Sequence, residues 1–136
     1  MSHTNKSVLE RFEVSNLALE FPEAEVPIET GNQRQGDVLL LRVTTKRSGL
    51  PIGAGVRVVA SENSPNTHTL HGDGLWEPNT RAGINGELVQ GWLTVAAGDE
   101  AFLIHSEEHG AIGIGEGTYE IRRQREYAGE WRQVAD

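Results

Sequence analysis

The sequence predicts a mainly β domain, a small barrel or sandwich of about seven or eight short strands. Three observations support this all-β fold class. Glycine supplies 16 of the 136 residues, well above its usual share of about 7%, and this favours many turns. Apolar runs are short and alternate with polar residues, as in half-buried strands. Turn-forming residues separate these runs.

The chain is expected to divide into an N-terminal arm, residues 1–35, and a single β domain, residues 36–136. In the arm, Leu17, Leu19 and Phe21 alternate with smaller or polar residues, which is the period of a half-buried strand. We expect this extended arm to dock on its own body or on a neighbouring protein. The candidate partner-binding residues of the arm are Leu17, Leu19, Phe21, Val26 and Ile28.

The β domain begins with an apolar run that is too short for a typical helix and is therefore predicted to be a central strand. In chain order, the main expected strands are residues 38–43, 55–60, 67–71, 88–95, 101–105, 111–114 and 118–124. In the last of these strands, Tyr119 and Ile121 should point inward. The residues Tyr127, Trp131 and Val134 have helical spacing and predict a short C-terminal helix, although Gly129 weakens it.

Composition excludes several classes of function. There is no cysteine, so disulfides, thiolate metal sites and a cysteine nucleophile are all excluded. The net charge of −8 disfavours binding to nucleic acid, whose affinity depends on neutralising phosphates with Lys and Arg. No apolar run reaches the length of a membrane span, about 18 residues. A protein partner or a small ligand is therefore expected in preference to DNA, and nothing marks an activated serine.

Histidines carry the main site hypothesis. Residues 105–109 match the His-x-x-Glu-His order of a class of zinc peptidases, but their flanks indicate a strand, a turn and a strand instead of the required helix. A looser hypothesis joins His68 or His71 on one strand to His105, Glu107 and His109, a ligand set that suits a divalent metal such as zinc, iron or nickel. The alternative is that these histidines form ordinary hydrogen bonds.

A second cluster lies near the C-terminus and combines basic and aromatic residues. Glutamates interleave with its arginines, so the cluster favours structural ion pairs over contact with nucleic acid. Its members are Arg122, Arg123, Arg125, Tyr127 and Trp131.

Several segments together resemble a family of small uncharacterised proteins of bacteria and their phages, over about residues 33–136. The segments are Gln35-Gly36-Asp37-Val38-Leu39, Thr67-His68-Thr69-Leu70, Glu107-Glu108-His109-Gly110, Gly117-Thr118-Tyr119-Glu120-Ile121-Arg122-Arg123-Gln124-Arg125-Glu126-Tyr127 and Val134-Ala135-Asp136. The arm is outside the resemblance. The family pattern, Gly-His-x-His followed by Thr-His-Glu-Glu-His, looks like a cluster that binds metal or protons. His68 and His109 match it, Asn66 and Ser106 replace its other two histidines, and His105 is shifted by one position.

The resemblance implies a phage or prophage source and gives no established activity. We therefore expect a non-enzymatic structural protein located in the virion, a capsid decoration or minor capsid protein. It would bind a protein lattice through its arm and a sheet face, with capsid protein or its own copies as partners and without a cofactor. The alternative is a metal-binding cupin-like module or enzyme that uses His68, His105 and His109. A weaker alternative is a host-interaction or regulatory module.

Overall fold

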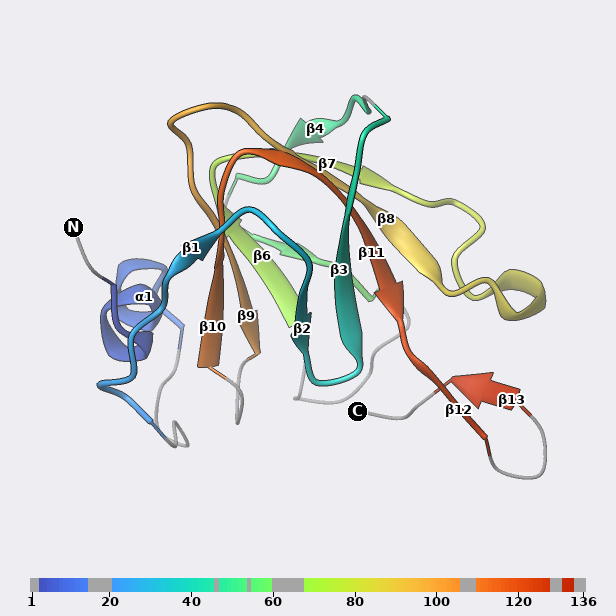
Figure 1. The fold of residues 1–136 in the computed structure, drawn as a ribbon, viewed down its shortest axis with the longest axis horizontal. Helices are drawn as coiled ribbons and strands as arrows, with labels where there is room; N and C mark the ends of the chain where they lie inside the picture. The colour runs from blue at the N-terminus through green and yellow to red at the C-terminus, as the bar shows by residue number, and fades with distance from the viewer. Residues whose placement is uncertain are drawn as a thin grey trace.

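The computed structural model describes residues 3–14, 21–45, 47–53, 55–59, 68–105, 110–127 and 131–133, with the backbone alone at 125–127 and 131–133. Eleven of the described strands form two sheets that face each other (Figure 1). The mainly β prediction is confirmed. No pairing between described strands joins one sheet to the other, so the architecture is a sandwich and not a closed barrel.

The first sheet has five strands. Their order is β1 (Ile28–Glu29), β10 (Gly110–Ile114), β9 (Ala101–His105), β6 (His68–Gly72) and β5 (Val56–Arg57). All pairs are antiparallel except the pair of β1 and β10, which is parallel and joins the arm to the sheet.

The second sheet has six strands, all antiparallel to their neighbours. Their order is β2 (Gln33–Gln35), β3 (Val38–Val43), β11 (Gly117–Arg123), β8 (Val89–Val95), β7 (Leu75–Pro78) and β4 (Leu50–Pro51). The loop between β7 and β8 contains a short 3-10 helix, η1 (Ile84–Gly86).

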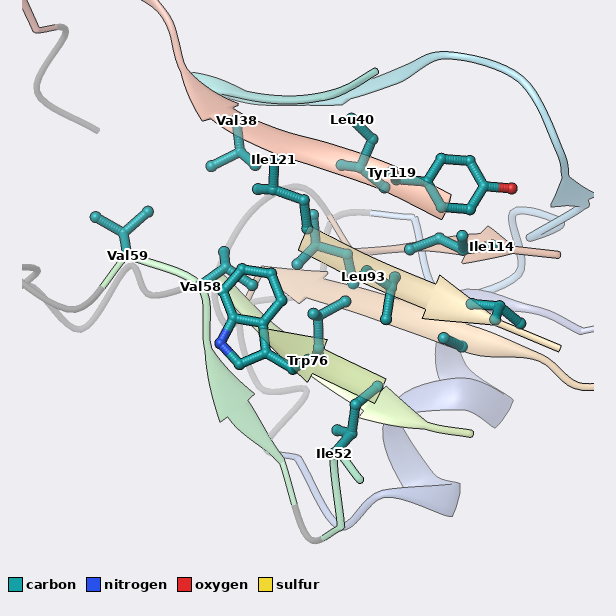
Figure 2. Packing of buried hydrophobic residues seen from close by; sticks show 14 residues of the cluster. Val38, Leu40, Ile52, Val58, Val59, Trp76, Leu93, Ile114, Tyr119 and Ile121 are labelled. Atoms are coloured by element: carbon teal, nitrogen blue, oxygen red, sulfur yellow. The ribbon is translucent and has the colours of Figure 1, made fainter. Parts of the chain in front are cut away.

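The main core lies between the sheets, and Figure 2 shows its side chains converging from both. Along β11, Tyr119 and Ile121 are fully buried, as their alternation in the sequence predicts. The Tyr119 hydroxyl donates a 2.9 Å hydrogen bond to the carbonyl oxygen of Gly115, so its polar end is satisfied. Burial raises the pKa of the Tyr119 hydroxyl above its ordinary value.

A helix, α1 (Asn5–Arg11), covers the outer face of the five-stranded sheet (Figure 1). Thr4 caps the helix by accepting a hydrogen bond from the Ser7 backbone. Val8 and Leu9 are 1% exposed and pack with Phe102 in a second apolar cluster, which also contains Val26. The burial of these side chains fixes the helix to the sheet.

The described part of the arm therefore docks on its own body. The Asn5 side chain accepts a hydrogen bond from the backbone of Ala111 and donates one to the carbonyl oxygen of Phe21. Of the candidate partner-binding residues, Val26 is 3% exposed in the chain's own core, Ile28 packs at its edge, and Phe21 is 63% exposed. Leu17 and Leu19 lie outside the described residues.

The described C-terminal segments form a hairpin and not the predicted helix. Strands β12 (Arg125–Tyr127) and β13 (Trp131–Gln133) pair antiparallel, with Tyr127 opposite Trp131. A spacing of four residues brings two side chains together on a helix, but it also makes them cross-strand partners when three residues connect the strands. The spacing alone could not distinguish the two structures.

Candidate functional site

His68 and His105 are brought together in the core by the pairing of β6 with β9. They are direct cross-strand partners, with ring centroids 4.5 Å apart. His68 is 0% exposed and His105 is 2% exposed. The sequence selected both residues, and the structure places them side by side within the sandwich.

Gln35 and Asp37 hold the His68 ring from the turn between β2 and β3. The Gln35 amide nitrogen donates to the carbonyl oxygens of Leu103 and Gly110, so its oxygen faces His68 Nδ1 at 2.9 Å. On the other side of the ring, His68 Nε2 lies 3.5 Å from Asp37 Oδ1. Both ring nitrogens of His68 therefore face oxygen atoms of neighbouring side chains.

Arg123 on β11 completes the arrangement. Its Nε and Nη2 atoms donate hydrogen bonds of 3.0 and 2.9 Å to Asp37 Oδ2. We call Gln35, Asp37, His68, His105 and Arg123 the buried polar cluster. It links the turn between β2 and β3 to strands of both sheets, and in it Arg123 forms an ion pair with Asp37.

The chemistry open to the buried polar cluster is limited by its burial. The side chains of His68, Asp37 and Arg123 are 0, 2 and 11% exposed, so a substrate has no open face on which to contact them. In this setting a buried carboxylate that pairs with Arg123 and faces His68 holds the geometry of the cluster. The described part of the cluster is built as a structural network.

The metal hypothesis is only partly within the described structure. Glu107 and His109 lie outside the described residues. Among the described residues, no group of three or more metal-binding side chains converges on one point. His68 could give a nitrogen lone pair to a metal only by leaving Gln35 or Asp37, because both ring nitrogens already face these partners.

A third histidine, His71, lies on β6 outside the buried polar cluster. It is 8% exposed, its Nε2 lies 2.9 Å from the Thr69 hydroxyl, and its ring packs 5.2 Å from the ring of Phe12 in the arm. Loss of solvent lowers the pKa of His71 below its ordinary value of 6.5.

We expect His71 to make stability fall as the pH drops below 6.5. The unfolded chain then takes up a proton that the folded chain resists until its lower pKa is reached, so protons favour unfolding. Chemical denaturation at a series of pH values should show a shallower loss in His71→Gln than in the wild type. Identical slopes in the two proteins would contradict this expectation.

The remaining predicted site residues are dispersed. Arg122 pairs with Glu120 at 2.6 Å on the outer face of β11, where its side chain is 44% exposed. The hairpin of β12 and β13 contains the backbone of Arg125, Tyr127 and Trp131.

Gln35 and Asp37 were not predicted to belong to the site. They flank Gly36, whose φ of +58° forms the turn before β3, and a polar pair around such a glycine has the pattern of an ordinary turn. The available signal was a polar turn directly before an apolar central strand.

These observations define a two-sheet β domain with a closed polar network in its interior. The chain belongs to the family described as Domain of unknown function (DUF8820), whose model matches residues 34–124. The expected membership of an uncharacterised family is confirmed over that range, and residues 125–136 lie beyond it. Searches of curated proteins and of solved structures found no match. No helix among the described residues is long and apolar enough to cross a membrane.

Proposed function

We propose that this protein is a non-enzymatic structural component of a phage particle, a capsid decoration or minor capsid protein that binds a protein lattice. The observation that supports a binding role is the outer face of the six-stranded sheet. There β3 presents Leu39, Leu41 and Val43, all partly exposed, on the side opposite the buried Val38 and Leu40. Contiguous apolar side chains on an outer sheet face offer a surface that a protein partner can cover.

The surroundings of this column also support a protein partner. Trp92 lies on the same face, and the Arg47 guanidinium stacks over its ring at 3.7 Å while pairing with Glu77 at 2.5 Å. Aromatic and arginine side chains are enriched in protein interfaces. In contrast to the five-stranded sheet, which α1 covers, this face has no described element over it (Figure 1).

The arm contributes less surface to this proposal than its sequence suggested. Its large apolar residues that the structure describes mostly pack on the body, and Phe21 is the large one that is exposed. In this proposal the outer face of the six-stranded sheet therefore makes the main lattice contact, and Phe21 makes a secondary one.

A cosedimentation assay tests this proposal with phage particles purified from a strain that carries the gene. Leu41→Lys puts a charge in the centre of the apolar column. It should weaken particle binding about tenfold or more, because the bound partner would remove water from the new charge. Glu10→Lys introduces the same side chain on the exposed surface of α1 and should bind as the wild type does. Absence of the protein from purified particles, or equal binding by both variants, would overturn the proposal.

The metal-binding cupin-like module or enzyme is the second candidate. One observation favours it: the centroids of the His68 ring on β6 and the His105 ring on β9 lie 4.5 Å apart, and His109 follows β9 in the sequence. Stoichiometric zinc, iron or nickel in purified protein, lost in His105→Asn and retained in His71→Asn, would favour this candidate. A host-interaction or regulatory module would instead copurify with one soluble protein and no particles.

A further inference from the structure

An apolar hollow of about 420 Å³ opens at one end of the sandwich. The connection after β4 and the turns after β6 and β8 meet there, with Ile52, Leu75 and Ala96 among the lining residues. Two exposed carboxylates, Asp73 and Asp99, also line it. The hollow therefore suits an apolar side chain that has a cationic neighbour.

The walls of the hollow are fixed by tight turns. The backbone nitrogen of Asp73 donates a 2.9 Å hydrogen bond to the carbonyl oxygen of Glu100, which ties the two turns together. Gly74 has a φ of +144°, and a Cβ there would lie 3.0 Å from a methyl group of Leu93. The chain can pass this closely only because Gly74 lacks a side chain.

At the opposite end of the β7–β8 hairpin, the loop presents an apolar side chain beside a cation. Ile84 is 52% exposed, and Arg81 is exposed three residues earlier. The backbone nitrogen of Ile84 donates a 2.9 Å hydrogen bond to the carbonyl oxygen of Arg81, and the backbone nitrogen of Gly83 donates a 3.0 Å hydrogen bond to the carbonyl oxygen of Glu87. We call this loop, residues 79–88, the tip.

The tip is ordered before any partner arrives. Asn79 donates from its side chain to the carbonyl oxygen of Val89 and accepts from the backbone of Arg81. Asn85 has a φ of +53°, a left-handed conformation that asparagine tolerates well. A preordered loop loses little conformational entropy on binding, so even a small contact can be formed.

We propose that the tip of one molecule inserts Ile84 into the hollow of a second copy, with Arg81 beside Asp73 and Asp99. The tip offers an apolar side chain to an apolar hollow, and the charge of Arg81 is opposite to those of Asp73 and Asp99. They lie at opposite ends of the same hairpin, because Pro78 pairs with Gly91 near the tip and Leu75 pairs with Thr94 near the hollow (Figure 1). They cannot meet within one molecule.

A contact between two different surfaces is head-to-tail and leaves a free hollow and a free tip at the ends of every assembly. Copies therefore add on to form rings or open chains. The contact is smaller than a standard interface, so it is weak in solution and gains strength when copies are held side by side on a lattice.

Sedimentation velocity of the purified full chain, up to about 1 mM, tests the contact. The wild type should sediment faster as its concentration rises. Ile84→Asp, which places a carboxylate in the acidic hollow, and Ala96→Trp, which fills the hollow from an exposed position, should each weaken association about tenfold or more. Ile84→Leu and Lys6→Glu, checked like the others for wild-type circular dichroism, should associate as the wild type does.

The sharpest readout is a mixture of the two defective variants. Ile84→Asp retains a hollow and Ala96→Trp retains a tip, so an equimolar mixture should form dimers and nothing larger. A wild type that stays monomeric, variants that still associate, or a mixture without dimers would each overturn the proposal. The assay contains no phage particle, so its result and the result of the particle-binding assay stand independently.

Discussion

Replacing Asp37 with alanine is expected to lower the free energy of unfolding by about 3–5 kcal/mol, the usual cost of breaking a buried ion pair from one side. The Asp37 carboxylate is 2% exposed and accepts two hydrogen bonds from Arg123 while facing His68. Its removal leaves the Arg123 guanidinium in the interior without the anion that offsets its lost hydration. Urea denaturation followed by tryptophan fluorescence and circular dichroism measures the change.

The partly exposed ion pair of Arg47 and Glu77 supplies the control for Asp37→Ala. Both side chains are about one-third exposed, so solvent screens their attraction, and Glu77→Ala should cost at most about 1 kcal/mol. If Asp37→Ala costs no more than Glu77→Ala, the buried polar cluster does not stabilise the fold in the way we infer.

Phe102→Ala should destabilise the protein by about 3–5 kcal/mol, the typical cost of removing a buried phenylalanine side chain. Phe102 is fully buried on the outer face of the five-stranded sheet, where its ring contacts His3 and Phe12 from the arm. The cavity would therefore lie directly under α1. Denaturation gives the global change, and hydrogen exchange at the α1 amides shows whether the helix is released first.

An exposed phenylalanine provides the matched control for this variant. Phe21 is 63% exposed, and Phe21→Ala should change the unfolding free energy by no more than about 0.5 kcal/mol. Wild-type stability and α1 exchange in Phe102→Ala would show that the arm is not held by the apolar cluster beneath it.

Strands were predictable from the sequence where apolar and polar residues alternate and the apolar residues are the buried ones. Residues 38–43 and 101–105 were expected as strands and coincide with β3 and β9. α1 was not expected, because its apolar positions Val8, Leu9 and Phe12 give only one helical turn of pattern and its capping box uses Ser7 at the position where glutamate is the usual signal. Its stability comes from the sheet beneath it, which a local pattern does not contain.

The candidate site shows the same division. His68 and His105 were chosen for their residue type, and their strands were recognised from the sequence, so both proved to be neighbours. Gln35 and Asp37 reach His68 across 33 and 31 positions of the chain, and Arg123 reaches Asp37 across 86 positions. No spacing rule connects residues that far apart, and the sandwich alone brings them into one cluster.

The parallel pairing of β1 with β10 has a consequence during synthesis of the protein. Residues of the arm dock on a strand that is made much later: Asn5 bonds to Ala111, 106 positions further along the chain. At about 5–20 residues per second, the arm waits roughly 5–20 s for its binding surface to be made. In that interval Val8, Leu9 and Val26 are available to other proteins. Where several ribosomes translate one message, an arm can reach a neighbouring chain and exchange with its equivalent.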